Sequence, residues 1–408
     1  MIRSDTRSAF QYALVIFTLT ALLGLANATG VFGTLDRNTL LTHLHSGTLG
    51  WITMGVIGLV LWMFGGRDLN TVVRISALAT AAYVLAFWSG NFQARAIFGV
   101  AMLGVVYGWW WFVVSKGMLE GWGSFDTAKL SVLFGLTTLV IGSTLGVIVQ
   151  VILGTGNTLP TSTDLVGAHA SAQVGGYLIL VAAGFIEWQL GGPGKRTIAG
   201  VVQVALLFIG GLILSGSFLL SSQLSPDMQQ ALPGVGTLFT LAGAVVVVIR
   251  LGRAALAVPW MSGGARHVAL SSGYLIVGVV LFALLVQQFI AAQGDQSKVS
   301  IGLLHSVDHV YFVGLMTNLL FGAIVVASAD RPRVWPWADN VIFWGLNLGI
   351  VAFVAVLLTQ GSGEGAKPFA SAVAYTAPIM GLSALLGIVT FQMRLMPASQ
   401  TVRSPATA

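Results

Sequence analysis

The stretch THLHSGTLGWITMGVIGLVLWMFGG, residues 42–66, is apolar enough to cross a membrane, yet it begins with two histidines, His43 and His45. A polar group in lipid must find a partner or be expelled, so ionisable residues inside spanning segments are functional by default. The place of this segment in the whole chain therefore bears on both the fold and the site.

The composition places the chain in a lipid bilayer. Of its 408 residues, 56% are hydrophobic and 8% are charged, and the mean hydropathy is +0.89. Such a chain is an integral membrane protein. No basic patch with interleaved aromatic residues predicts nucleic-acid binding, although the net charge is +6. Cysteine is absent, which excludes disulfides, thiolate metal sites and covalently attached heme.

Twelve apolar segments reach the length of about 20 residues that a spanning helix needs. The sequence predicts an all-α membrane protein with a single polytopic domain over residues 1–408, whose first segment is a helix rather than a removed signal peptide. Pro378 is the one proline expected well inside a helix. The segments are 9–33, 39–64, 72–90, 94–115, 129–154, 165–190, 197–222, 231–252, 267–293, 299–328, 338–360 and 369–394.

The basic residues predict the orientation. With twelve helices, fifteen of the nineteen Lys and Arg residues fall in the two termini and the even-numbered loops, and four fall in the odd-numbered loops. Positively charged loops stay on the cytoplasmic side, so both termini are expected there. We expect a multi-pass protein of the bacterial inner membrane.

Five of the six histidines lie at a common depth. His43 and His45 fall near the start of the second segment, His169 near the start of the sixth, and His305 and His309 near the start of the tenth. Even-numbered helices run inward, so all five lie on the order of 6 to 15 Å below the outer interface. Imidazole is the commonest metal ligand, and five imidazoles at one depth predict a shared metal or heme site.

Two other ionisable residues are expected to have ordinary roles. His267 falls at the edge of a cytoplasmic loop, where solvent or lipid headgroups would surround it. Glu187 lies close to the cytoplasmic end of the sixth helix, from which its side chain can extend to water.

The spacing of the histidines separates them into sites. His43 and His45 differ by about 200° around a helix, so they serve two neighbouring sites, whereas His305 and His309 differ by about 40° and share one face. Asp308 either accepts a hydrogen bond from an imidazole N–H or bonds outward to a helix end or loop.

Heme iron suits this pattern better than a bare metal ion. Zinc or iron sites usually include carboxylates, and the only other acid near this level is Asp164. Heme needs one or two axial histidines and a large apolar slot.

Three segments carry a resemblance to a known superfamily. THLHSGTLGWITMGVIG (42–58) is similar to the His-x-His-x-Gly segments of heme-copper oxidase catalytic subunits, especially the cbb type, and to the His-Ala-His helix start of NnrS-type membrane proteins. GAHASAQVGGYLILVAAGF (167–185) resembles the sixth oxidase helix, and LLHSVDHVYFVGLMTNLLFGAIV (303–325) the tenth. The resemblance covers essentially the whole chain and implies a twelve-helix bundle with cytoplasmic termini.

The resemblance also implies roles for the histidines. His43 or His45, with His305 or His309, would be axial ligands of a low-spin heme b. The remaining histidine of the tenth helix would ligate a second heme, and His169 would face the place where oxidases hold copper.

The seventh segment departs from the oxidase pattern. Residues 197–222 contain neither His nor Tyr, whereas an oxidase has a His pair there to complete its copper site. Copper is therefore doubtful and dioxygen reduction is not expected. The leading hypothesis is a protein with one or two b-type hemes that handles electrons, supplied by a redox protein or quinol, or a diatomic gas such as nitric oxide. The alternative is a secondary transporter in which the histidines relay protons or metal ions.

Overall fold

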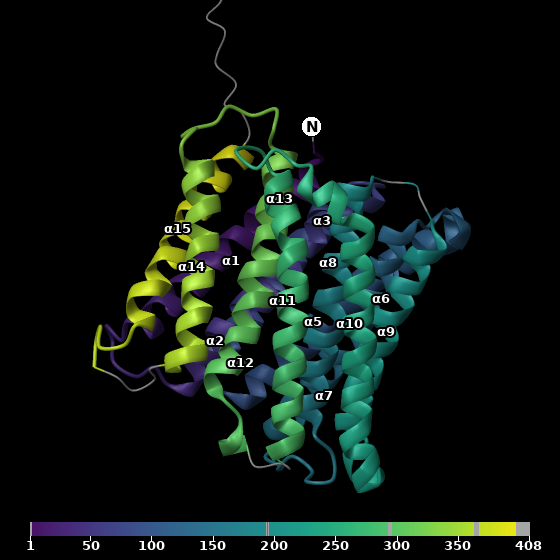
Figure 1. Ribbon diagram of the computed structural model, residues 1–408, viewed down its shortest axis with the longest axis vertical. Helices are drawn as coiled ribbons and strands as arrows, with labels where there is room; N and C mark the ends of the chain where they lie inside the picture. Colours follow the sequence, from purple (N-terminus) through teal and green to yellow (C-terminus); the bar gives the residue numbers. More distant parts are fainter. Residues whose placement is uncertain (1, 193, 195, 293–295, 363–366, 397–408) are drawn as a thin grey trace, which may run out of the picture.

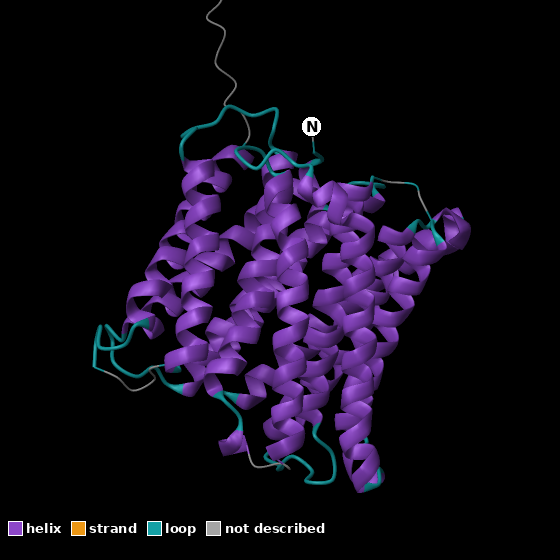
Figure 2. Ribbon diagram, viewed as in Figure 1, coloured by secondary structure: helices purple, strands orange, loops and turns teal. Residues whose placement is uncertain are grey.

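The chain folds as a bundle of helices. The computed structural model describes residues 2–192, 194, 196–292, 296–362 and 367–396. These residues form helices and loops and contain no strand (Figure 2). Twelve helical spans are long and apolar enough to cross a membrane, and each corresponds to one predicted segment. The predicted fold class, an all-α protein with twelve spanning helices, is confirmed.

We number the spans 1 to 12 along the chain (Figure 1). Nine spans are single α-helices: α1 (Ser4–Thr29), α4 (Asn70–Trp88), α5 (Phe92–Glu120), α6 (Thr127–Gly154), α9 (Ile198–Leu219), α10 (Pro226–Leu256), α11 (Ala265–Ala292), α14 (Ala338–Gln360) and α15 (Val373–Leu395). Short 3₁₀ turns lie between spans at η2 (Trp122–Ser124), η5 (Ser221–Gln223) and η6 (Gln296–Lys298).

Spans 2, 6 and 10 change helix type partway along. Each starts as an α-helix, passes through a π-helical segment and returns to an α-helix. Span 2 is α2 (Arg37–His45), η1 (Ser46–Thr53) and α3 (Met54–Phe64); span 6 is α7 (Leu165–Ser171), η3 (Ala172–Leu178), α8 (Ile179–Ile186) and a second π segment, η4 (Glu187–Gly191); span 10 is α12 (Ile301–His309), η7 (Val310–Thr317) and α13 (Asn318–Ala327).

These three spans form the centre of the bundle. In the most apolar stretch of each, 83%, 67% and 78% of residues are buried, against 28% to 56% in the other nine spans. Successive spans pack side by side, and α1 packs against α15, which brings the first and last spans together. The N terminus lies at one end of the bundle, and α2, α7 and α12 lie toward the other (Figure 1). We call these ends the N-terminal face and the far face.

In a π-helical segment, a backbone carbonyl can lose its usual intrahelical hydrogen bond. Two threonine hydroxyls donate hydrogen bonds to such carbonyls. The hydroxyl of Thr53 donates to the carbonyl of Thr48 at 2.9 Å, and the hydroxyl of Thr317 donates to the carbonyl of Phe312 at 2.8 Å. Both bonds reach back five residues, the period of a π turn. Such segments often mark functional sites inside α-helices.

The same threonines join the central spans to one another. The indole N–H of Trp51 in η1 donates to the hydroxyl of Thr317 in η7 at 2.8 Å, and the hydroxyl of Tyr177 in η3 donates to that of Thr53 at 3.3 Å. Trp51 is 1% exposed and stacks on Phe17 of α1. Buried polar groups need such partners in an apolar core. The three central spans are therefore held together at their π-helical segments.

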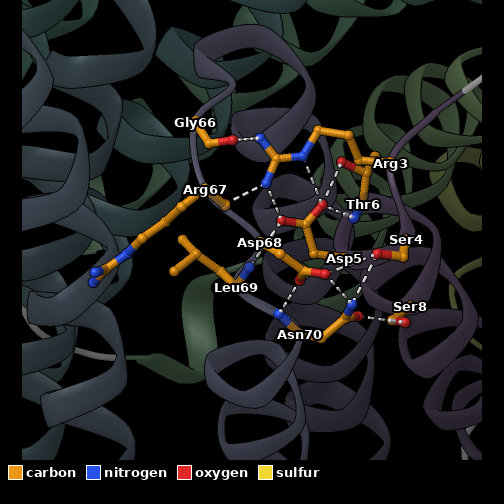
Figure 3. A network of polar contacts seen from close by, with 10 residues as sticks. All are labelled: Arg3, Ser4, Asp5, Thr6, Ser8, Gly66, Arg67, Asp68, Leu69 and Asn70. Atoms are coloured by element: carbon orange, nitrogen blue, oxygen red, sulfur yellow. Dashed lines mark hydrogen bonds and ion pairs between the residues drawn. The ribbon is translucent and has the colours of Figure 1, made fainter.

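A polar network fastens the start of span 1 to the loop after span 2 (Figure 3). The Arg3 guanidinium donates to the carbonyls of Gly66 and Arg67 and pairs with the buried Asp5 at 2.5 Å. Asp5 also accepts from the backbone N–H of Leu69 at 3.1 Å. The network fixes α1 against span 2, and both contribute to the histidine region at the far face.

Several helix boundaries differ from the sequence-based prediction by up to five residues, and one of them changes the position of a proline. Span 8 begins at Pro226, five residues before the predicted start at residue 231, so Pro233 lies inside α10. The prediction that Pro378 is the one internal proline is therefore wrong. Ser225 caps the helix by accepting a hydrogen bond from the backbone N–H of Met228 at 3.4 Å. Pro226 follows in the first turn, where a backbone N–H has no intrahelical acceptor, so the N–H that proline lacks is not missed.

Candidate functional site

All three central spans begin at the far face with a side-chain cap. Asp36 accepts from the backbone N–H groups of Asn38 and Thr39, Asp164 accepts from Gly167, and Ser300 accepts from Leu303. Hydrogen bonds from the side chain and backbone of Thr39 hold the pKa of Asp36 below its ordinary value. Asp164 is thus occupied as a helix cap. The caps start each span four to eight residues before its histidines.

Two of the histidines form hydrogen bonds with the preceding span and pack against it. The Nδ1 atom of His43 donates to the Thr20 carbonyl of α1 at 2.9 Å, and that of His169 donates to the Gly142 carbonyl of α6 at 2.7 Å. A Cβ atom added at Gly24 would lie 2.8 Å from Cε1 of His43, and one added at Gly146 would lie 2.8 Å from Cε1 of His169. Each imidazole therefore fills a place that only glycine leaves open.

Two others bond to their own helix. The Nδ1 atom of His45 donates to the Leu41 carbonyl, and that of His309 donates to the His305 carbonyl, both at 2.7 Å. Aromatic rings also fix their planes. His45 stacks on Phe87 with centroids 3.6 Å apart, and His309 lies 4.7 Å from the ring of Phe353.

These bonds determine which nitrogen is free. A carbonyl oxygen only accepts, so Nδ1 must carry the proton and Nε2 must carry the lone pair in all four rings. Within the described residues, Nε2 of these rings makes no hydrogen bond. The four residues are half-buried although their spans are the innermost of the bundle. An imidazole tied at Nδ1 with a free Nε2 is the usual state of a metal ligand.

The structure divides the five predicted ligands into two groups. His43 of span 2 is a neighbour of His305 and His309 of span 10. His45 of span 2 is instead a neighbour of His169 of span 6. This grouping agrees with the opposite directions expected for His43 and His45, because His43 contacts α1 and His45 contacts α4.

Asp308 lies half-buried between His305 and His309. None of the four Nδ1 hydrogen bonds described above involves its carboxylate, since every one ends on a backbone carbonyl. Backbone carbonyl groups accept the hydrogen bonds that orient these four imidazoles. Accepting such a bond was one of the two roles expected for Asp308 from the sequence.

A buried arginine near His45 escaped the sequence analysis. Arg95 of α5 is 2% exposed and donates to the side-chain oxygen of Asn38 at 2.7 Å and to the Phe87 carbonyl at 2.9 Å. Its guanidinium lies 4.7 Å from the centre of the Phe87 ring, on which His45 also stacks. In sequence it was one of four basic residues assigned to odd-numbered loops, and no local pattern revealed its burial.

Two expectations for single residues are wrong. His267 is 1% exposed rather than solvated, and its Nδ1 lies 2.9 Å from Oδ1 of Asn318. Glu187 is 6% exposed and does not reach water, because Arg250 of α10 forms a bidentate ion pair with it at 2.5 and 2.6 Å. Each residue found a partner on another span, which the sequence of its own span could not indicate.

The donor set of the site is made of imidazoles. Within the part of the chain that the structure describes, no group of three or more His, Asp or Glu side chains is placed to hold a metal ion. Pairs of imidazoles without carboxylates fit an iron porphyrin, because the macrocycle itself supplies the four equatorial nitrogens.

The comparisons with known proteins bear on the fold. No model of a known protein family matches the sequence, and no curated protein matches it. A heme-copper terminal oxidase, solved by cryo-electron microscopy as a dimer, superposes on the chain with a TM-score of 0.67 and 11% sequence identity. The match covers 97% of this chain and 84% of the oxidase chain. The protein therefore has the twelve-span fold of a heme-copper terminal oxidase.

Proposed function

We propose that the protein binds heme b non-covalently between His43 of span 2 and His305 or His309 of span 10. The observation that carries this proposal is the pair His43 and His309, which are neighbours on spans 2 and 10 and both have Nδ1 engaged and Nε2 free. The bound heme supplies an iron atom that changes oxidation state and that can bind a diatomic gas where an axial position is open. The function is electron transfer, or the handling of a gas such as nitric oxide.

The packing around the pair supports this proposal. Spans 2 and 10 pack closely through their π segments η1 and η7, deeper in the bundle than the histidines. Their α-helical beginnings, α2 and α12, are instead packed mainly against α4 and α14. The imidazoles thus lie where the two spans diverge, and a flat macrocycle requires such a separation between its axial ligands.

The charge distribution supports a membrane setting for the site. The excess of Lys and Arg in the termini and even-numbered loops makes the N-terminal face cytoplasmic and the far face periplasmic in a bacterial inner membrane. The candidate heme then lies in the periplasmic half, within reach of a redox protein or a quinol. The terminal-oxidase fold supports a redox role in the membrane. We also propose that residues 1–408 form one domain.

The first prediction is the presence of heme b. The protein purified from heme-replete cells should give a sharp reduced band in the visible spectrum. Acidified organic solvent should extract the pigment, because the chain has no cysteine to tether it. A colourless preparation that gains no band on reconstitution with hemin would contradict the proposal and favour the transporter hypothesis.

The second prediction concerns dioxygen. Reducing dioxygen by four electrons needs a second metal held by several imidazoles beside the heme iron. The α9 helix contributes no His or Tyr to such a centre. We expect oxygen uptake with a reduced donor to stay near the rate of free heme, with well under one copper per heme. Rapid uptake with stoichiometric copper would show that other residues supply the missing ligands.

A further inference from the structure

The three central spans repeat one another in the placement of their histidines. Each histidine can be counted back from the first residue of the adjacent π segment, which is Ser46 in η1, Ala172 in η3 and Val310 in η7. The residue three positions before these starts is His43 in span 2, His169 in span 6 and Val307 in span 10. The residue directly before them is His45, Ser171 and His309, respectively.

The two histidines at the earlier position have the same surroundings. His43 bonds to the carbonyl of Thr20 and packs on Gly24, four residues later in α1. His169 bonds to the carbonyl of Gly142 and packs on Gly146, four residues later in α6. In both cases the supporting helix is the span that precedes the histidine in the chain.

The two histidines at the later position also match. His45 and His309 each bond to the carbonyl four residues earlier in their own helix, at 2.7 Å. Each packs on a phenylalanine of the span that follows, Phe87 of α4 for His45 and Phe353 of α14 for His309. In these contacts span 2 is therefore equivalent to span 6 at the earlier position and to span 10 at the later position.

These equivalences give two matching pairs. The pair His309 and His43 joins the later position of span 10 to the earlier position of span 2, and the two residues are neighbours. The pair His45 and His169 joins the later position of span 2 to the earlier position of span 6, and these residues are neighbours as well. At the third place, Ser171 and Val307 provide no imidazole.

Arg95 indicates what the second pair binds. Its cation is buried, and the groups that it contacts are a neutral amide, backbone carbonyls and the rings of Phe87 and Phe92. No carboxylate of the described residues lies within ion-pair distance of it. A buried charge is costly unless an opposite charge compensates it. The propionate groups of a heme are carboxylates, and Arg95 lies near the start of α5 and packs on Phe87, the same ring on which His45 stacks.

We propose that His45 and His169 are the axial ligands of a second heme, which lies between spans 2 and 6. The positive charge of Arg95 compensates the negative charge of a heme propionate. The inference rests on the proposed function for the first pair. It assigns the second heme to spans 2 and 6, whereas the resemblance placed it on the remaining histidine of span 10. The protein is then a carrier of two bis-histidine hemes in equivalent sites.

Heme stoichiometry in the purified full-length protein tests the proposal. The pyridine hemochrome assay, with protein measured independently, should give two hemes per chain. The variants His169→Ala and His43→Ala should each retain one, and the double variant should retain none. His267→Ala, which removes a buried imidazole outside both pairs, should retain two. Addition of imidazole to His169→Gly should restore the second low-spin spectrum, which separates ligand loss from misfolding.

The outcomes distinguish the two proposals. A single heme that is lost in His43→Ala and kept in both His45→Ala and His169→Ala would overturn the second site and leave the proposed function intact. A wild-type protein without heme would overturn both. Arg95→Gln gives a further readout, because removal of a buried cation should lower the midpoint potential of the heme that His169→Ala removes. An unchanged potential would contradict the role of Arg95.

Discussion

Replacing His43 with Ala is expected to abolish the low-spin spectrum of the heme between spans 2 and 10. The imidazole is oriented by the Thr20 carbonyl and by the close approach of Gly24, and an alanine at this position provides no ligand atom. Loss of one axial ligand leaves a five-coordinate, high-spin iron or an empty site. The measurement is the reduced-minus-oxidised difference spectrum together with electron paramagnetic resonance of the oxidised protein.

The control for this variant is His45→Ala, two residues away. His45 packs on Phe87 on the other side of span 2, so its loss should perturb a different centre and leave the His43 signal in place. Identical spectra for the two variants would mean that neither residue is an axial ligand. Binding of carbon monoxide by His43→Ala, and not by the wild type, would further show that an axial position has opened.

Replacing Glu187 with Ala is expected to cause the largest loss of stability. Glu187 and Arg250 are 7% and 15% exposed, and Gln203 shares the same guanidinium at 2.7 Å. Removal of one partner leaves a buried charge without compensation, which costs about 3 to 5 kcal/mol. The free energy of unfolding in mixed detergent micelles, followed by tryptophan fluorescence, measures the effect.

A surface pair provides the matched control. Lys116 and Glu120 lie 3.5 Å apart on α5, where Glu120 is 42% exposed, so Glu120→Ala should change the stability by about 0.5 kcal/mol or less. Replacing Glu187 and Arg250 together with apolar residues should recover much of the loss, because no unpaired charge then remains. A destabilisation by Glu187→Ala no larger than that of Glu120→Ala would contradict the assignment of a buried ion pair.

The sequence predicted the number and order of the spans because a bilayer imposes a length on each apolar segment. Those signals are local, and each of the twelve segments can be recognised without its neighbours. Helix boundaries were predicted less well, and at span 8 the proline-containing stretch before residue 231 resembles a loop. In the structure this stretch forms the first turns of α10, where Ser225 provides a cap.

The histidine depth could also be predicted, because residue number along a helix converts directly into distance. The opposite directions of His43 and His45 follow from the same geometry. The sequence could not indicate which histidine faces which, since that depends on how spans 2, 6 and 10 pack. It also missed the burial of Arg95 and the ion pair of Glu187, because their partners lie on other spans.

The sequence by itself determined a twelve-span membrane protein with five imidazoles on three spans, because hydropathy and helical rise act along a single chain segment. Only the tertiary structure decided how those imidazoles are grouped. The carbonyls of α1 and α6 select the Nδ1–H tautomer of His43 and His169, and the packing of the central spans at their π segments sets His43 against His309 and His45 against His169. The two imidazole pairs join residues more than a hundred positions apart, and the carbonyls lie on a different span from the histidines that they orient, so no local pattern records these contacts.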